Sequence, residues 1–319
     1  MDWFGTPMQP MPGGYSGETF LVGHNGDAVV LRIYHRHPER LLVDVSLLRL
    51  MDGVLPVPHI VEIRPADRDR PGVLVTARLP GERLDLVLGR CNTDLRRTLG
   101  RALGGVLAAL SGIPMLGAGF FAGRSLRIES RDFPDRLDVW AQAFREQGSL
   151  AGWAPGDFDG LTGLIDSAAE LFMGPNASWS NEDPGPALRR HVLVHGDLNP
   201  KNVLVDPERG EVTGVLDWEF SHAGSPYADI GNLTRFERHP DFVSQVLDTF
   251  IAQAPALADD PLTLGRAADL WALVELAGRP GRNAVQELAT TLLLAQARTQ
   301  DLHAWPWPTP RVDPAPLAP

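Results

Sequence analysis

Two short segments constrain this chain more than any other part of its sequence. Residues 195–206 read HGDLNPKNVLVD, and residues 217–220 read DWEF. Between them, residues 202–206 and 211–217 have the composition of two strands joined by a loop that contains Gly210. Such a hairpin would bring the polar residues at the start of the first segment close to Asp217 in the second. The segment is therefore either an ordinary polar loop or a site that holds a cation and a reacting hydroxyl.

The pairing of this hairpin predicts which side chains meet. If Asp206 pairs near Glu211, then Asn202 pairs near Val215, one side-chain alternation short of Asp217. Neighbouring strands lie about 4.8 Å apart and rise about 3.4 Å per residue. We therefore expect Asn202 and Asp217 to converge on one ion.

The residue types favour magnesium as that ion. Amide and carboxylate oxygens, here from Asn202 and Asp217, are the hard ligands that Mg²⁺ prefers, and water and substrate phosphates complete its octahedron. Asp197 lies five residues before Asn202, on the loop that enters the hairpin. A carboxylate in that place can accept a proton from an attacking hydroxyl.

Length and composition place the chain among globular enzymes. Its 319 residues are enough for one large domain or two lobes, and 44% hydrophobic with 22% charged residues is an ordinary globular balance. The single cysteine, Cys91, excludes an internal disulfide framework and fits a reducing compartment. No segment has the pattern of a signal peptide or a membrane span, so we expect a soluble, cytoplasmic protein.

The net charge of −11 bears on the partners. Nucleic-acid binding depends largely on Lys and Arg that neutralise phosphates, so we expect no nucleic-acid partner. The acidic balance is compatible with a cationic small molecule, and equally with a surface that is merely kept soluble.

The first 85 residues are predicted to be rich in strands. Asn25-Gly26 is typical of a hairpin turn, and with that turn Arg32 lies opposite Thr19. A helix is expected from Pro38 to Gly53, with Asp44 beside its apolar stripe. Residues 55–65 and 72–85 read as two more strands, and the Pro80-Gly81 turn in the second is the expected lobe boundary.

Beyond that turn the sequence predicts mainly helices, with strands returning only at residues 191–217. The helical segments are 95–112, 136–148, 161–174, 242–254, 264–278 and 284–299. The proline-rich tail, residues 305–319, is expected to pack loosely or not at all.

The ordered set of motifs resembles the aminoglycoside phosphotransferase and choline kinase type of small-molecule kinase. The spacing from His195 through Asp197 to Asn202 matches the kinase catalytic loop H-R-D-x-x-x-x-N, with glycine in place of arginine at position 196. Asp217-Trp218-Glu219 stands where protein kinases have Asp-Phe-Gly. The segments that carry the resemblance also include GGYSGETFLV, the strand with Arg32, LPVPHI and ADIGNLTRF, and together they cover most of the chain.

The resemblance implies an α+β, two-lobed protein-kinase-like fold with ATP, or GTP, bound in the cleft. A small β-rich N-lobe would span residues 1–80 and a larger, mainly helical C-lobe residues 81–304. Mg²⁺ would be held by Asn202 and Asp217, and Asp197 would be the catalytic base or hydroxyl-orienting group. His195 would brace the loop through hydrogen bonds.

The resemblance also implies a nucleotide site in the N-lobe, with two departures from the family pattern. The segment GGYSG, with Gly14, Ser16 and Gly17, is the expected phosphate cover. Arg32 stands where the family has a lysine that contacts phosphates, and Asp44 where the family has a helical glutamate that pairs with it. Because arginine is longer than lysine and aspartate is shorter than glutamate, Arg32 and Asp44 either compensate each other in length or indicate a damaged nucleotide site.

Several further residues have a structural interpretation beside a functional one. Asp229 is expected to fix the catalytic loop by accepting backbone hydrogen bonds. Glu219 assists the metal or faces solvent. Asp269 and Glu275 lie on a helix that often lines the acceptor pocket in this family, but a solvated helix face is the simpler interpretation.

The main functional hypothesis is transfer of the γ-phosphoryl group of ATP to a hydroxyl of a small molecule, with an antibiotic as the first candidate. A metabolite kinase acting on an amino alcohol, homoserine or a sugar is close behind. The alternative from another class is a pseudokinase-like, nucleotide-binding regulatory protein. The altered Arg32 and Asp44 favour it, whereas the presence of Asp197, Asn202 and Asp217 speaks against it.

Overall fold

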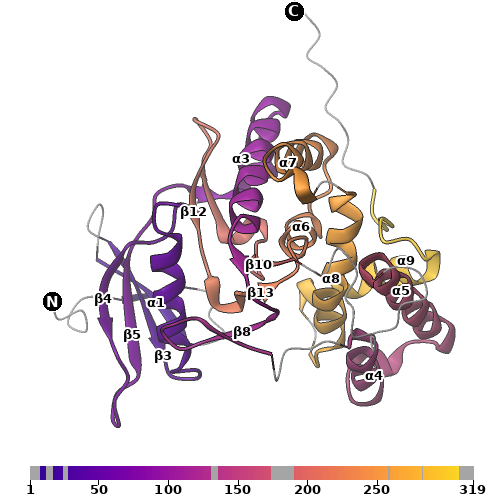
Figure 1. The fold of residues 1–319 in the computed structure, drawn as a ribbon, viewed down its shortest axis with the longest axis horizontal. Helices are drawn as coiled ribbons and strands as arrows, with labels where there is room; N and C mark the ends of the chain where they lie inside the picture. The colour runs from indigo at the N-terminus through magenta and orange to yellow at the C-terminus, as the bar shows by residue number, and fades with distance from the viewer. Residues whose placement is uncertain are drawn as a thin grey trace, which may run out of the picture.

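The computed structural model describes residues 8–11, 17–23, 28–130, 136–173, 190–257, 259–281 and 283–308. A β-rich N-terminal region lies beside a mainly helical C-terminal part, as the sequence predicts (Figure 1). The fold class is therefore α+β.

The N-terminal region is a five-stranded antiparallel sheet in the order β1-β2-β3-β5-β4. Thr19 lies opposite Arg32, so the predicted register is confirmed, although the Asn25-Gly26 turn falls outside the described residues. Helix α1 follows β3 and buries the predicted stripe of Leu41, Val45 and Leu48. The elements are β1 (Met8–Met11), β2 (Glu18–Val22), β3 (Val29–Tyr34), α1 (Arg40–Met51), β4 (Ile60–Arg64) and β5 (Gly72–Ala77).

The C-terminal part contains all six helices that periodicity predicts, because each has an apolar face long enough to read in the sequence. They are α3 (Thr93–Ser111), α4 (Leu137–Gln147), α5 (Pro155–Met173), α7 (Pro240–Gln253), α8 (Pro261–Gly278) and α9 (Ala284–Thr299). In Figure 1, α3 and α7 lie side by side at the top of the view, and α5, α8 and α9 lie together in its right half. In the described part of the chain, no helix combines the length and apolar character needed to cross a membrane.

The expectation that no strands occur between residue 85 and residue 191 is wrong. A second five-stranded sheet has the order β7-β10-β13-β8-β9 and draws three strands from that interval. These strands have only two to four residues, too few for an alternating pattern to show. The sheet consists of β7 (Pro114–Met115), β8 (Gly119–Ala122), β9 (Arg127–Glu129), β10 (His191–Val194) and β13 (His222–Gly224).

The hairpin that follows the HGDLNPKN segment pairs β11 (Val203–Asp206) with β12 (Glu211–Val215). Asp206 lies opposite Glu211 as predicted. The register shifts by one residue between Leu204 and Val205, so Val203, and not Asn202, lies opposite Val215. A bulge of this kind leaves no mark in an apolar run, which is why the sequence missed it.

The chain changes sheets at the expected lobe boundary. Strand β5 belongs to the N-terminal sheet, whereas β6 (Glu82–Arg83) pairs with β11 of the β11–β12 hairpin. The short helix α2 (Leu84–Leu88) follows directly. On this basis we propose that the boundary lies at Pro80 and Gly81.

The start of the proline-rich tail does not pack loosely. Trp305 and Trp307 pack against the core, and the Trp307 ring meets Phe236 edge to face at 6.5 Å between ring centroids. The sequence-based expectation gave too much weight to the prolines between the tryptophans and too little to the area that two indoles bury. Residues 309–319 lie outside the described residues.

Helix α6 (Ala228–Thr234) crosses α8 through a pair of glycines. A Cβ at Gly231 would lie 2.0 Å from the Gly265 carbonyl oxygen and 2.7 Å from Cβ of Asp269. Only hydrogen at this position lets the two backbones approach so closely.

We predict that Gly231→Ala lowers the free energy of unfolding by about 1–3 kcal/mol or more, because the added methyl has to push α6 away from α8. Gly105→Ala in α3 is the matched control, since its Cβ would meet only the Gln253 side chain, at 3.8 Å. The control should be neutral or stabilise by up to about 1 kcal/mol through helix propensity. Urea unfolding measures both, and equal effects would contradict the close crossing.

Candidate active site

The loop that carries Asp197 is held in place by a buried carboxylate on α6. Asp229 accepts a hydrogen bond from the His195 backbone N–H at 2.7 Å and another from the Gly196 N–H at 2.9 Å. Burial raises the pKa of Asp229 to about 6, although both hydrogen bonds favour the charged form. This is the bracing role that the sequence predicts for Asp229.

His195 supports the same loop from inside. Its Nε2 lies 2.9 Å from the Leu216 carbonyl oxygen, and its Nδ1 accepts the Asp197 backbone N–H at 3.2 Å. These partners require a neutral ring with the proton on Nε2, and burial lowers the pKa of His195 to about 4. Next to it, Gly196 has φ +81° and a Cβ there would lie 2.4 Å from the Phe220 carbonyl oxygen, so arginine cannot occupy this position.

Asp197 is oriented by two amides. Asn199 Nδ2 donates to its Oδ1 and Asn202 Nδ2 to its Oδ2, each at 2.7 Å. Burial raises the pKa of Asp197 above its ordinary value, while Asn199, Arg235 and Asn202 oppose that rise. The carboxylate is thus fixed in direction and made more basic than a surface aspartate.

Asn202 has a defined amide orientation. Its Nδ2 also donates to the Asp197 carbonyl oxygen at 2.9 Å, so both contacts on that side are with acceptors. The nitrogen has to face Asp197, and Oδ1 is left to accept from, or coordinate, another group. The Leu216 N–H donates to the Asn202 carbonyl oxygen at 2.8 Å, which places Asn202 beside the residue that precedes Asp217.

Asp217 follows β12 in the left-handed conformation, with φ +62° and ψ +64°. This backbone turns the chain sharply before the short 3₁₀ helix of residues 218–220. Burial and the neighbouring Glu219 raise the pKa of Asp217 to about 6, although Arg32 opposes the rise. The position therefore concentrates negative charge that a cation would relieve.

Arg32 carries the positive charge that balances this cluster. Its Nη1 lies 3.2 Å from Asp217 Oδ1, and its Nη2 donates to Glu219 Oε2. Burial alone would lower the pKa of Arg32, but Tyr34 and the surrounding carboxylates raise it above the ordinary value. The guanidinium joins strand β3 to the segment after β12, and Glu219 is a buried ion-pair partner and does not face solvent.

Asp44 lies near Arg32 but has other hydrogen-bond partners. Arg32 Nη1 is 4.0 Å from Asp44 Oδ2, whereas Tyr34 Oη donates to Asp44 at 2.7 Å and Arg40 Nε at 2.8 Å. Arg40 also donates to the Trp218 carbonyl oxygen. The sequence correctly brought Asp44 toward Arg32, and it missed Tyr34 and Arg40, which have no recognisable motif.

The expected phosphate cover is described only in part. Gly14 and Ser16 lie outside the described residues. A Cβ at Gly17 would lie 1.8 Å from the Ile33 carbonyl oxygen, so the approach of β3 demands a glycine here whatever the loop binds.

The interpretation of Asp269 as part of a solvated helix face is wrong. Asp269 on α8 is buried and forms a two-point ion pair with Arg235, with nitrogen-to-oxygen distances of 2.6 and 2.7 Å. Arg235 lies close enough to Asp197 to lower its pKa. Glu275 follows the solvated interpretation, since it is exposed to solvent and pairs with Arg279 one turn later.

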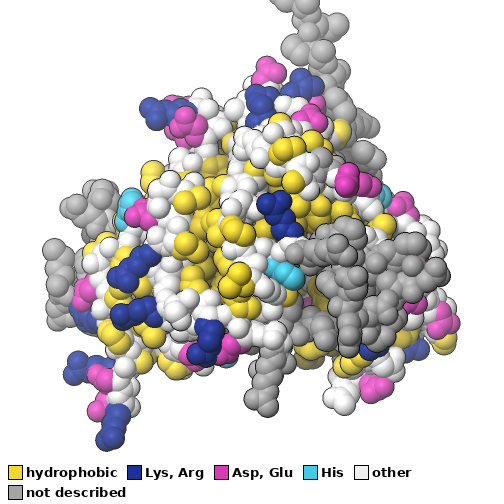
Figure 2. Space-filling view, viewed as in Figure 1, with side chains coloured by type: hydrophobic (Ala, Val, Ile, Leu, Met, Phe, Trp, Pro, Cys, Tyr) yellow, Lys and Arg dark blue, Asp and Glu magenta, His cyan; other side chains and the backbone are white. Residues whose placement is uncertain are grey.

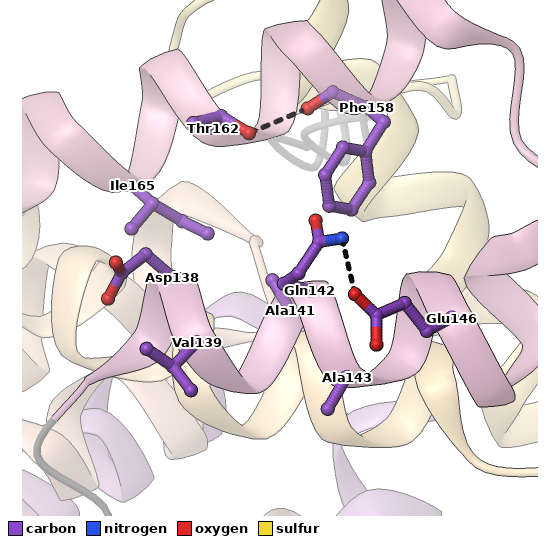
Figure 3. A pocket seen from close by; sticks show the side chains of 9 residues that line it. All are labelled: Asp138, Val139, Ala141, Gln142, Ala143, Glu146, Phe158, Thr162 and Ile165. Atoms are coloured by element: carbon purple, nitrogen blue, oxygen red, sulfur yellow. Dashed lines mark hydrogen bonds between the residues drawn. The ribbon is translucent and has the colours of Figure 1, made fainter.

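A hollow of about 500 Å³ lies elsewhere, between α4 and α5 (Figure 3). Gln142 and Glu146 on one wall are hydrogen bonded to each other, and Phe158 and Ile165 face them from α5. None of the candidate site residues lines this hollow.

The comparison with protein families decides the affiliation of the chain. The model of the phosphotransferase enzyme family matches residues 7–263, which include every candidate site residue. The chain belongs to the phosphotransferase enzyme family.

Solved structures support the kinase-like fold of this phosphotransferase. A thermostable mutant of aminoglycoside phosphotransferase APH(4)-Ia, in a ternary complex with AMP-PNP and hygromycin B, gives a TM-score of 0.62 at 18% identity over 92% of each chain. The GDP complex of a mutant aminoglycoside 2'-phosphotransferase-IIIa gives a TM-score of 0.63 at 18% identity, over 92% of this chain and 86% of that one. At this identity the likeness concerns the fold.

Curated relatives match over shorter stretches. Acyl-CoA dehydrogenase family member 10 of Mus musculus is 49% identical over 45 residues, which are 14% of this chain and 4% of that protein. Acyl-CoA dehydrogenase family member 11 of Rattus norvegicus is 25% identical over 112 residues, 34% of this chain and 14% of that protein. Clavilactone A biosynthesis cluster protein Y of Ampulloclitocybe clavipes is 63% identical over 35 residues, which are 11% of this chain and 8% of that protein. The chain thus spans only a small part of each of these relatives.

The raised pKa of Asp229 predicts a specific pH dependence of stability. Between pH about 4 and 6 the folded state holds a proton that the unfolded state has already lost, so this group makes the free energy of unfolding fall as pH rises. The effect should be on the order of 2–3 kcal/mol over that interval. Urea unfolding of wild type and Asp229→Asn at pH 4, 5 and 6 should show the fall in the wild type and a flatter curve in the variant. Parallel curves would contradict the buried, proton-binding carboxylate.

Proposed function

We propose that this phosphotransferase moves the γ-phosphoryl group of ATP, or GTP, to a hydroxyl of a small molecule, with Asp197 as the catalytic residue. The observation that carries the proposal is the fixed carboxylate of Asp197, which two amides orient at the entrance of the hairpin that leads to Asp217. Phosphoryl transfer needs little covalent chemistry from the protein, so positioning and charge account for most of the catalysis.

In this proposal Asp197 orients the acceptor hydroxyl and takes its proton. The proton leaves the hydroxyl oxygen as the oxygen–phosphorus bond forms, and the bond between the γ-phosphorus and the bridging oxygen of the nucleotide breaks. A pKa raised by burial suits a base that works near neutral pH. Arg235 near Asp197 opposes that rise in pKa, which favours the ionised carboxylate that can accept a proton.

Asn202 and Asp217 would hold Mg²⁺. The residues fit this ion, because the Asn202 amide leaves Oδ1 free of Asp197 and Asp217 is a strained, partly buried carboxylate with a pKa raised by its surroundings. When bound, the ion would neutralise charge on the phosphates.

Arg32 is proposed to contact the nucleotide phosphates in place of the family lysine. Its Nη atoms engage Asp217 and Glu219, and its buried Nε has no hydrogen-bond partner among the described residues. Asp44 would support the site through the hydrogen bonds that it accepts from Tyr34 and Arg40. Gly14, Ser16 and Gly17 remain the proposed phosphate cover. Nucleotide binding by this fold is supported by the neighbours solved with AMP-PNP and GDP.

Two classes of acceptor are candidates. An antibiotic acceptor is supported by the neighbour solved with hygromycin B. A metabolite is supported by the ion pair in which Arg235 neutralises Asp269 close to Asp197. A strongly cationic acceptor would instead favour acidic side chains left unpaired at this place.

Asp197→Asn should lower kcat by about 10²–10⁴-fold and leave the Kd of Mg·ATP nearly unchanged, because a general base acts on the transfer step. The measurement is acceptor-dependent ADP formation across aminoglycosides, macrolides, choline, homoserine, hydroxy acids and sugars, with nucleotide binding followed by calorimetry.

Glu208→Gln is the matched control for this experiment, since Glu208 is an exposed acid on the loop of the same hairpin. It should behave as wild type. Transfer by Asp197→Asn at the wild-type rate would reject the role of Asp197. Nucleotide binding without transfer to any acceptor would favour the regulatory alternative.

Metal binding should depend on pH through Asp217. Its pKa of about 6 means that a proton competes with the cation below that pH, so the Kd for Mn²⁺ without nucleotide should rise about tenfold per pH unit there. Above pH 7 it should level off. Paramagnetic resonance titrations between pH 5 and 8 measure this, and Asp217→Asn should bind weakly with little pH dependence. A wild-type profile as flat as that of the variant would exclude Asp217 as a ligand.

A further inference from the structure

A second hollow lies beside the catalytic region and has a basic lining. It has a volume of about 370 Å³ and lies between the start of α7, the second turn of α8 and the segment of residues 303–305. Its lining residues are Arg238, Pro240, Val243, Ser244, Arg266, His303 and Trp305. None of them is an acid, so every charged side chain on its wall is a hydrogen-bond donor.

Arg266 is buried in this wall without a counter-ion. It is 8% exposed, and its Nε has no hydrogen-bond partner among the described residues. Its Nη1 donates to His303 Nδ1, and His303 Nε2 lies 2.8 Å from Thr263 Oγ1, so the ring between them is neutral. Burial and the nearby Arg238 lower the pKa of Arg266 to about 10, although Asp301 and Asp260 act in the opposite direction from farther away.

Arg238 and Trp305 add two more hydrogen-bond donors without a carboxylate partner among the described residues. The Arg238 guanidinium lies over the Trp305 ring, 5.1 Å from its centroid, and its Nε donates to the Arg235 carbonyl oxygen at 3.3 Å. Burial lowers the pKa of Arg238 to about 10. The indole Nε1 of Trp305 is buried and has no acceptor in the described part of the chain.

Such an arrangement is costly unless something supplies acceptor atoms. An unsatisfied buried donor loses its hydration without compensation, and two guanidinium groups that share a hollow repel each other. No carboxylate of the described residues lies within ion-pair distance of Arg238 or Arg266, although arginines elsewhere in the chain are commonly paired.

We propose that this hollow, defined by Arg238, Arg266 and Trp305, binds the phosphate or carboxylate group of a small molecule. The planar guanidinium groups present paired N–H donors that match the oxygens of either group, and the indole N–H adds a third direction. A single small group of this kind fits the hollow with room for the carbon skeleton that carries it.

The hollow connects to the catalytic carboxylate through a line of alternating charges. Arg238 lies near Asp269, Asp269 is paired with Arg235, and Arg235 acts on Asp197. The inference therefore deepens the proposed function and rests on it where it concerns the acceptor. The anionic group belongs either to the acceptor itself or to a separate small effector.

The first test measures binding and needs no turnover. With Mg·ADP saturating the nucleotide site, calorimetry compares glycerol 3-phosphate with glycerol, two probes that differ by the anionic group alone. Wild type should bind the phosphate probe and not glycerol. Arg266→Gln and Arg238→Gln should each weaken binding about tenfold or more, because each removes hydrogen bonds between charged groups.

Matched variants guard against a loss of structure. Arg279→Gln changes an exposed arginine that directly follows the same helix α8 and pairs with Glu275, and it should bind as wild type does. Trp305→Phe keeps the ring and removes the indole N–H, so it should weaken binding less than loss of either arginine. If Arg266→Gln fails to fold, Arg238→Gln alone tests the proposal, since Arg238 lies on a separate segment before α7.

The second test separates the two sources of the anion. In the transfer assay, a KM for anionic acceptors that rises in Arg266→Gln while the KM for ATP stays constant assigns the hollow to the acceptor. A rate toward neutral acceptors that changes with added glycerol 3-phosphate in wild type only assigns it to an effector. The proposal is overturned if wild type binds neither glycerol 3-phosphate nor inorganic phosphate, or if both arginine variants bind as tightly as wild type. Neither result would touch the transfer reaction itself.

Discussion

One guanidinium group holds the catalytic region against the N-terminal sheet. Arg32, on β3, contacts Asp217 and Glu219 and lies 4.0 Å from Asp44 on α1. Without this largely buried cation the three charged carboxylates would be unstable, since burial raises the pKa of Asp44 and of Asp217. Removing one partner of a buried pair costs more than the pair contributes, so the cluster is a unit and not a set of independent contacts. An arginine suits it because the fork reaches two carboxylates at once, which the single ammonium of lysine cannot do in the same plane.

The remainder of the site is built on backbone contacts that leave little freedom. Asp229 accepts two successive N–H groups of the catalytic loop, and it lies on α6, whose distance from α8 is set by the contact between Gly231 and Gly265. The same crossing brings Asp269 to Arg235 and so toward Asp197. A change in how α6 packs would therefore alter both the orientation of the catalytic loop and the charge beside it. Rigid support of this kind is what positioning catalysis requires.

The sequence predicted the parts of this molecule that leave a periodic or spaced pattern. Six helices have long apolar stripes, the predicted hairpin register puts Thr19 opposite Arg32, and the spacing from His195 to Asn202 predicted the candidate catalytic loop. Strands of two to four residues and the bulge at Leu204 leave no such pattern, because they are too short or lie inside uniform apolar runs.

Burial was the other quantity that the sequence could not supply. Asp269 read as a surface acid because a polar residue at the edge of an apolar stripe usually faces water, and its partner Arg235 is 34 residues away. Arg238, Arg266 and Trp305 likewise come from three separate segments, and nothing in their spacing indicates that they share one hollow. Sites made by tertiary contact between unrelated segments become visible only in three dimensions.

The sign of the charge near the site need not follow the net charge of the chain. A total of −11 suggests affinity for cations, yet at physiological ionic strength exposed charges are screened beyond about 8 Å. Figure 2 shows acidic and basic side chains interspersed around the periphery of one face, with hydrophobic side chains across its middle. A ligand in a hollow responds instead to the few groups that touch it. At Arg238 and Arg266 those groups are positive and partly desolvated, so the local field favours an anion although the whole chain is acidic.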